Sequence, residues 1–192
     1  ASNKLGTQMK ATGEVMSIGR TMEESLLKAM RSLETGVCHI YHKKFDDWTN
    51  DRLLEYIAEP TDDRLYAIAQ LIRGGVDLVL IYNRTKIDMF FLEKFKNIVE
   101  FERVVEAAPM DIEVLREAKR MGFSDKFIGQ LWGVSQHDMY LLREKNGIFP
   151  VYKMIDTCAS EFASYVPYFY STYEEENESI VSPKEKIIVL GS

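Results

Sequence analysis

The chain has 192 residues, enough for one ordinary domain that buries its own core. Hydrophobic residues make up 46% and charged residues 28%, which excludes a fibrous protein and disorder over most of the chain. The net charge of −6 argues against attraction to nucleic acid by the overall field. Two cysteines exclude a disulfide scaffold, and no membrane span or secretory signal is evident, so the sequence predicts a cytoplasmic protein.

The first helix is expected from Thr21 to Gly36, after an arm of residues 1–20 that has little periodicity. Thr21 and Glu24 have the spacing of a capping box. Gly36 is placed to end the helix in a left-handed conformation. Apolar residues at intervals of three to four predict its buried face: Met22, Leu26, Met30, Leu33 and Val37.

Two shorter helices are predicted next. One covers 53–58, after a mixed segment over 38–48 that is typical of a loop. The other lies between 62 and 75, with an aspartate cap at its start and a Gly-Gly pair at its end. Residues 76–82 are ambiguous, because their composition favours a strand and seven residues are too few for periodicity to decide.

A long helix over 88–107 has a wide apolar stripe and is expected to be central. Three short helices follow, each with an Asp or Ser cap and a Gly stop: 111–121, 124–132 and 135–146. After Pro150 the helical register is lost, although the chain is rich in tyrosine there. We therefore predict an all-α fold, a compact bundle of about seven short helices with non-helical arms at both ends.

The segment from Lys186 to Gly191 has the pattern of a buried parallel strand that enters a glycine turn. A lone strand of this kind is not stable by itself. We interpret the chain as a piece of a larger polypeptide that ends just inside the next domain. The alternative is a C-terminal strand that pairs within this domain.

No catalytic or metal site is predicted. Cys38, His39 and His42 are potential metal ligands, but a fourth ligand at tetrahedral zinc spacing is missing, so a surface loop is the better interpretation. Cys158 is expected to be a buried structural thiol. Glycine-rich phosphate loops are absent, since Gly74-Gly75 lies at a helix C-terminus, where the dipole repels phosphate.

Residues 122–149 resemble a helix-turn-helix, in which two short helices meet at a glycine. Binding to nucleic acid is therefore the alternative function. However, only Arg143 and Lys145 add positive charge to the second helix, whereas phosphate contacts need several cations on one face. A helix pair used for packing explains the pattern better.

Three segments together resemble the large chain of carbamoyl phosphate synthetase. The first is Gln8–Thr21, with the sequence QMKATGEVMSIGRT. The second is Pro150–Phe162, with the sequence PVYKMIDTCASEF. The third joins Tyr170–Glu176, YSTYEEE, to Lys186–Gly191, KIIVLG. Their order and separations fit along essentially the whole chain.

The resemblance implies a place between two similar ATP-grasp halves, which a helical oligomerisation domain joins. Residues 1–20 would be the tail of the first half, 21–175 the oligomerisation domain, and 176–192 a linker with the first strand of the second half. A helix is implied for 76–82. The parent enzyme, an ATP-dependent ligase, makes carbamoyl phosphate from bicarbonate, ammonia or glutamine nitrogen, and ATP, for arginine and pyrimidine biosynthesis.

The implied partners are a second copy of the chain, the flanking ATP-grasp halves and the small glutaminase chain of the parent, with no nucleic acid and no membrane. ATP and Mg or Mn belong to the parent enzyme. None of the family's ATP-binding residues falls on a matched position, so the chain itself is predicted to hold no cofactor, no metal and no catalytic residue.

Two surfaces are predicted. The apolar residues of the 38–57 segment are the least explained, and they form the candidate self-association surface: Tyr41, Phe45, Trp48, Leu53, Leu54 and Ile57. The alternative is that they complete the core. Residues near the tyrosine-rich segment form the candidate contact to the neighbouring catalytic halves: Asp156, Phe162, Tyr168, Tyr170 and Tyr173.

Overall fold

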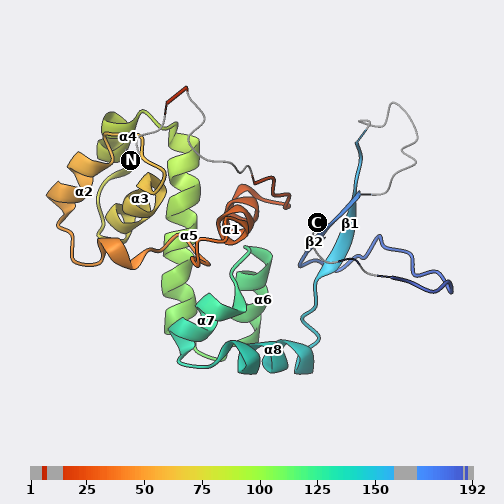
Figure 1. Cartoon of the computed structure of the whole chain (residues 1–192). Coiled ribbons are helices and arrows are strands. Elements are labelled where there is room, and N and C mark those ends of the chain that lie inside the picture. The colour runs from red at the N-terminus through yellow and green to blue at the C-terminus, as the bar shows by residue number, and fades with distance from the viewer. Residues whose placement is uncertain (1–5, 8–14, 158–167, 188, 190–192) are drawn as a thin grey trace. The chain divides into compact units, whose positions relative to one another are not determined.

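The computed structural model describes residues 6–7, 15–157, 168–187 and 189 (Figure 1). The chain divides into two compact units, residues 1–149 and 150–192, which we name the helical unit and the strand unit. Each is described separately below. The domain limits expected from the sequence, at residues 20 and 175, stay predictions.

The helical unit contains eight α-helices within its described residues, so the expected all-α class is confirmed. Their bounds are α1 Met22–Ser32, α2 Asn50–Tyr56, α3 Arg64–Arg73, α4 Leu78–Thr85, α5 Met89–Ala107, α6 Ile112–Arg120, α7 Asp125–Trp132 and α8 Gln136–Lys145. A short 3₁₀ segment covers Lys43–Phe45. The ambiguous segment at 76–82 enters α4, with the side chain of Asp77 accepting a hydrogen bond from the Val79 amide.

Helix α5 is the centre of this unit, as its wide apolar stripe predicts (Figure 1). It packs against α1, α3, α4, α6 and α7. Its buried residues are mostly apolar: Leu92, Phe95, Ile98, Val99, Glu102 and Val105. The indole Nε1–H of Trp132 donates to the Val105 carbonyl at 2.6 Å, which ties α7 to the same helix.

Most helix ends lie where the caps predict them. The side chains of Asp88, Asp111, Ser124 and Ser135 all accept hydrogen bonds from first-turn amides. The glycines expected as stops have positive φ: Gly75, Gly122, Gly133 and Gly147. These signals are local, which is why the sequence reveals them.

The prediction for α1 is wrong in two respects. The helix ends at Ser32, about one turn before Gly36. Its buried residues are Glu23, Glu24, Leu27 and Met30, so of the predicted stripe only Met30 is buried within the helix. The two carboxylates can be buried because both have polar partners, Asn97 on α5 for Glu23 (2.8 Å) and the Arg20 amide for Glu24 (2.7 Å).

The strand unit contains a two-stranded antiparallel ladder of β1, Val151–Ile155, and β2, Tyr168–Thr172. Lys153 pairs with Tyr170 in its register. The sequence analysis placed this region in a non-helical arm and missed the ladder, although its β-branched and aromatic residues are typical of strands. Cys158 and Phe162 lie outside the described residues.

The strand expected near the C-terminus is not formed by the residues that the structure describes there. Lys186, Ile187 and Val189 belong to no strand. The other residues of that segment, 188 and 190–192, lie outside the described part. A strand needs a partner to satisfy its backbone, so its assignment to a following ATP-grasp half stays a prediction.

Candidate functional site: association surface and buried networks

Half of the predicted self-association surface is in the core. Phe45, Leu53 and Ile57 are each at most 1% exposed, so their assignment to a surface is wrong. Helix α2 begins at Asn50, which places Leu53 and the residue after its last turn, Ile57, on the same inner face. Apolar side chains at that spacing complete the core instead.

Trp48 and Leu54 are half-buried and Tyr41 is exposed. The Trp48 ring is covered by the Arg52 guanidinium at 3.6 Å and meets the Tyr56 ring edge-on at 5.2 Å. Lys44 lies 5.0 Å from the Tyr56 centroid and bonds the Asp63 carboxylate. These contacts tie the 41–49 loop to α2 and α3, whereas the Tyr41 side chain stays 38% exposed.

Apolar side chains are also exposed on α4, at Val79, Leu80 and Tyr82. Ile81 is the buried residue of α4. At the start of α5, Phe90 and Phe91 are exposed as well, and Phe90 lies beside Met22 and Lys94. The sequence analysis missed the exposed side of α4, although a helix that is apolar on most sides is a usable signal, because such helices are normally covered.

His39 lies in the core of the helical unit rather than on a surface loop, which corrects the interpretation of that segment. Its Nε2 is 2.9 Å from Glu102 Oε1 on α5. Its ring stacks on Phe127 with centroids 3.6 Å apart. Within the described residues, Nδ1 has no hydrogen-bond partner. His39 therefore acts as a packed donor, with its proton assigned to Nε2 by the Glu102 contact.

Glu102 joins this histidine to α3. Arg73 donates from Nε to Oε2 and from Nη2 to Oε1, both at 2.7 Å, in a bidentate pair. Arg73 Nη2 also donates to the Ile40 carbonyl at 2.9 Å. Burial alone would raise the pKa of Glu102, but the Arg73 and His39 hydrogen bonds hold it below its ordinary value. One carboxylate thus fixes α3, α5 and the 39–40 segment together.

Folding stability is expected to fall as the pH is lowered from about 7.5 to about 5.5, because His39 stays neutral in the fold. Burial lowers the pKa of His39 below its ordinary 6.5, although Glu102 opposes the shift. Over this pH range the unfolded chain therefore binds a proton at His39 that the folded chain does not bind. For one pH unit below the ordinary pKa of histidine, the free energy of unfolding falls by at most about 1.4 kcal/mol.

Urea unfolding at both pH values checks this expectation. His39→Gln is the comparison, because its amide can still donate to Glu102 but does not titrate. The variant should lose less stability than the wild type over the same range. An equal loss in both proteins would show that His39 is not the group responsible.

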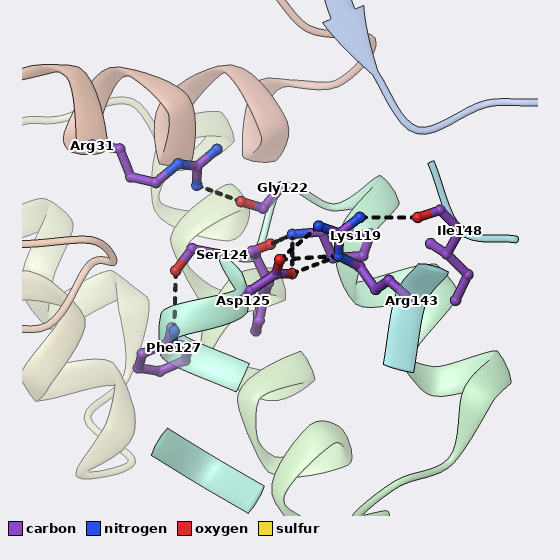
Figure 2. Close-up of polar contacts among 9 residues, drawn as sticks. Arg31, Lys119, Gly122, Ser124, Asp125, Phe127, Arg143 and Ile148 are labelled. Atoms are coloured by element: carbon purple, nitrogen blue, oxygen red, sulfur yellow. Dashed lines mark hydrogen bonds and ion pairs between the residues drawn. The ribbon is translucent and has the colours of Figure 1, made fainter. Parts of the chain in front are cut away.

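A second network joins α6, α7 and α8 around Asp125 (Figure 2). Arg143 donates from Nη2 to Oδ2 at 2.7 Å and from Nε to Oδ1 at 2.9 Å, and Lys119 Nζ lies 2.9 Å from Oδ1. The cations also bind carbonyls, Lys119 that of Phe123 at 2.7 Å and Arg143 that of Ile148 at 2.9 Å. Burial lowers the pKa of Lys119 to about 8, against the pull of Asp125.

Gly122 brings α1 against this network. Its φ of +97° is in the left-handed region, and a Cβ there would lie 2.9 Å from the Cα of Glu24. Arg31 on α1 donates to the Gly122 carbonyl at 2.6 Å (Figure 2). Glycine is therefore required for both the turn and the close approach of α1.

The network also changes the helix-turn-helix interpretation. Arg143 is 7% exposed and bonded to Asp125, so it is not available for phosphate. The exposed start of α8 presents Gln136, His137 and Asp138, as the sequence indicates. The α7–α8 pair is built for packing, and nothing in its charge favours nucleic acid.

The candidate contact residues in the strand unit differ in exposure. Tyr168 is 56% exposed and Asp156 is exposed, whereas Tyr170 and Tyr173 are half-buried. The neighbouring acidic run has a counter-ion: Lys153 Nζ lies 3.3–3.4 Å from carboxylate oxygens of Glu174, Glu176 and Glu178. The role of these residues as a contact to catalytic halves stays a prediction.

In the part of the chain that the structure describes, no helix combines the length and hydropathy needed to cross a membrane. Over the same residues, His, Cys, Asp and Glu side chains form no group of three or more that could hold a metal ion. His39 and Glu102 lie 2.9 Å apart, but His39 stacks on Phe127 and Glu102 is paired with Arg73.

Comparison with known protein families identifies the helical unit. Residues 14–147, which include the helices α1 to α8 of the described residues, match the family model of the carbamoyl-phosphate synthetase large chain, oligomerisation domain. The match covers more than two thirds of the chain and agrees with the resemblance drawn from its sequence motifs.

Proposed function

Because this chain belongs to the carbamoyl-phosphate synthetase large chain oligomerisation-domain family, we propose that its helical unit is a stiff, non-catalytic module that both self-associates and spaces two catalytic halves. The observation that carries this proposal is the family match over every helix from α1 to α8. The large chain is part of a ligase, and in this proposal its chemistry takes place outside the helical unit.

The two buried networks support the role of a stiff spacer. Glu102 holds α3, α5 and the 39–40 segment, and Asp125 holds α6, α7 and α8. Ion pairs with several hydrogen bonds each have few alternative arrangements, because a shifted helix would leave a buried charge unpaired. Such a body can keep two attached domains at a fixed separation.

We assign the ATP and the Mg or Mn of the parent reaction to the flanking ATP-grasp halves, and we include the small glutaminase chain among the parent's partners. Gly74 and Gly75, a glycine pair of the helical unit, lie at the C-terminal end of α3. The partial negative charge there disfavours phosphate. The glycine placement thus supports a chain that holds no nucleotide itself.

Light scattering after size exclusion tests self-association on the 192-residue chain over a hundredfold concentration range. We expect the molar mass to rise with concentration to that of a dimer or a larger oligomer. Association by apolar burial should also persist at high salt, since salt screens only the charged rim. A monomer at every concentration would contradict the proposal of self-association.

A further inference from the structure

A hollow of about 270 Å³ lies between the 35–43 segment and α7, and we name it the α7 hollow. Its size is just below the range of about 300–1,000 Å³ that is typical of small-molecule sites, so it suits a compact ligand. Val37 and Phe127 form apolar parts of its wall. Two lysines and two histidines also line it, and they carry the argument below.

The lining of the α7 hollow is positively charged. Lys43 from the 3₁₀ segment and Lys126 from α7 both line it, and none of its lining residues in the described part of the chain is acidic. Within the same part, neither lysine is in an ion pair. Asp46, which contacts the lining residue Tyr41, accepts from the Tyr41 hydroxyl at 2.6 Å. In a chain of net charge −6, two unpaired ammonium groups at one recess favour a ligand with two negative charges.

The two histidines of the hollow offer one donor and one acceptor. His42 Nδ1 accepts from the Lys44 amide at 3.0 Å, so the proton of the neutral ring is on Nε2, which is left as a donor. His39 has the opposite arrangement, because its Nε2 contacts Glu102. The buried Nδ1 of His39 has no hydrogen-bond partner among the described residues. Such an atom is uncommon in native proteins, which favours a ligand that carries a donor.

These groups together define the chemistry of the ligand. An ammonium group is disfavoured as the donor to His39, because two lysines already line the hollow. A hydroxyl group is a neutral donor and meets no such repulsion. The apolar wall at Val37 and Phe127 suits a short carbon chain between the charged groups. A small organic acid with two carboxylates and a hydroxyl satisfies all of these conditions.

We propose that the α7 hollow binds a small hydroxydicarboxylate, the class of organic acid to which malate belongs. The two carboxylates pair with Lys43 and Lys126, and His42 Nε2 donates to one of them. The hydroxyl of the ligand donates to His39 Nδ1. This ligand site goes beyond self-association, and it does not depend on the oligomeric state. A ligand in this place bridges the 35–43 segment and α7.

Calorimetric titration of the 192-residue chain with three four-carbon dicarboxylates tests the ligand class. Malate carries a hydroxyl, succinate has a hydrogen in its place, and aspartate has an ammonium group. Malate should bind at least about tenfold more tightly than the other two, because succinate leaves His39 Nδ1 unpaired and aspartate adds a positive charge. The absence of malate binding, or equal affinity for malate and succinate, would overturn the proposal.

Glutamine substitutions of the two lysines test the place of binding. Lys43→Gln and Lys126→Gln should each weaken malate binding at least about tenfold, because the amide stays polar but loses the charge. Lys145→Gln is the matched control, since Lys145 is exposed on α8 and does not line the hollow. Circular dichroism checks that each variant is folded. The same affinity in all three variants as in the wild type would contradict the assigned site.

Alkylation of Cys38 locates the ligand without a change to either lysine. Cys38 lines the hollow and is half-buried, and in a Cys158→Ser chain it is the only thiol. At about ten times its dissociation constant, malate should slow the reaction of Cys38 with the neutral reagent iodoacetamide by about tenfold, because about a tenth of the sites stay open. An unchanged rate at a malate concentration that calorimetry finds saturating would place the ligand elsewhere and overturn the proposal.

Discussion

Replacement of Asp125 by alanine is expected to lower the free energy of unfolding of the helical unit by about 3–5 kcal/mol. The variant leaves Lys119 and Arg143 with their charges buried and without the carboxylate that both contact. Burial alone would raise the pKa of Asp125, but Arg143 and Lys119 hold it below its ordinary value, so it is ionised at neutral pH. Urea unfolding, followed by the helical circular dichroism signal, measures the loss.

Asp47→Ala is the control for this prediction. Asp47 lies in an exposed turn, so its removal should change the free energy of unfolding by no more than about 0.5 kcal/mol. A cost below about 1 kcal/mol for Asp125→Ala would mean that the Phe123 and Ile148 carbonyls compensate the two cations. The network would then not be what orders α6, α7 and α8.

The helices could be predicted because their signals are local. A cap such as Ser135 or a stop such as Gly133 acts on amides and carbonyls within one turn, so the residues near each end determine it. The ambiguous residues 76–82 show the limit of this approach. Seven apolar-rich residues fit the period of a helix as well as that of a strand. The Asp77 cap and the packing on α5 favour the helix α4.

The Glu102 network could not be predicted, because its members are far apart in the sequence. His39 lies 63 positions from Glu102, and Arg73 lies 29 from it. Each is an ordinary polar residue in its own segment, and only the tertiary fold gives it a partner. The same reason explains the wrong face of α1, where burial of Glu23 depends on Asn97 of α5.

Half of the predicted association surface was wrong for a different reason. Apolar content alone does not separate a core residue from an interface residue, since both are removed from water in the assembled protein. Phe45, Leu53 and Ile57 are in the core because the 3₁₀ turn and α2 direct them inward. Helix α4 shows the opposite case, since Val79, Leu80 and Tyr82 stay exposed beside the buried Ile81.

Replacement of Glu102 by alanine is the second large effect that we expect, again about 3–5 kcal/mol of the free energy of unfolding. The variant removes both hydrogen bonds of the Arg73 fork and the acceptor of His39 Nε2 at once. Arg73 keeps its bond to the Ile40 carbonyl, but a guanidinium that is 19% exposed would lack its counter-ion. Urea unfolding again gives the loss.

Glu106→Ala is the matched control, because Glu106 lies one turn further along α5 and is exposed. Both variants remove a glutamate from the same helix, so any difference between them reports the contacts of Glu102 rather than helix propensity. A large loss in the free energy of unfolding for Glu102→Ala alone would show that this carboxylate holds the 39–40 segment in place. Equal small losses would mean instead that the stacking of His39 on Phe127 holds that segment without the ion pair.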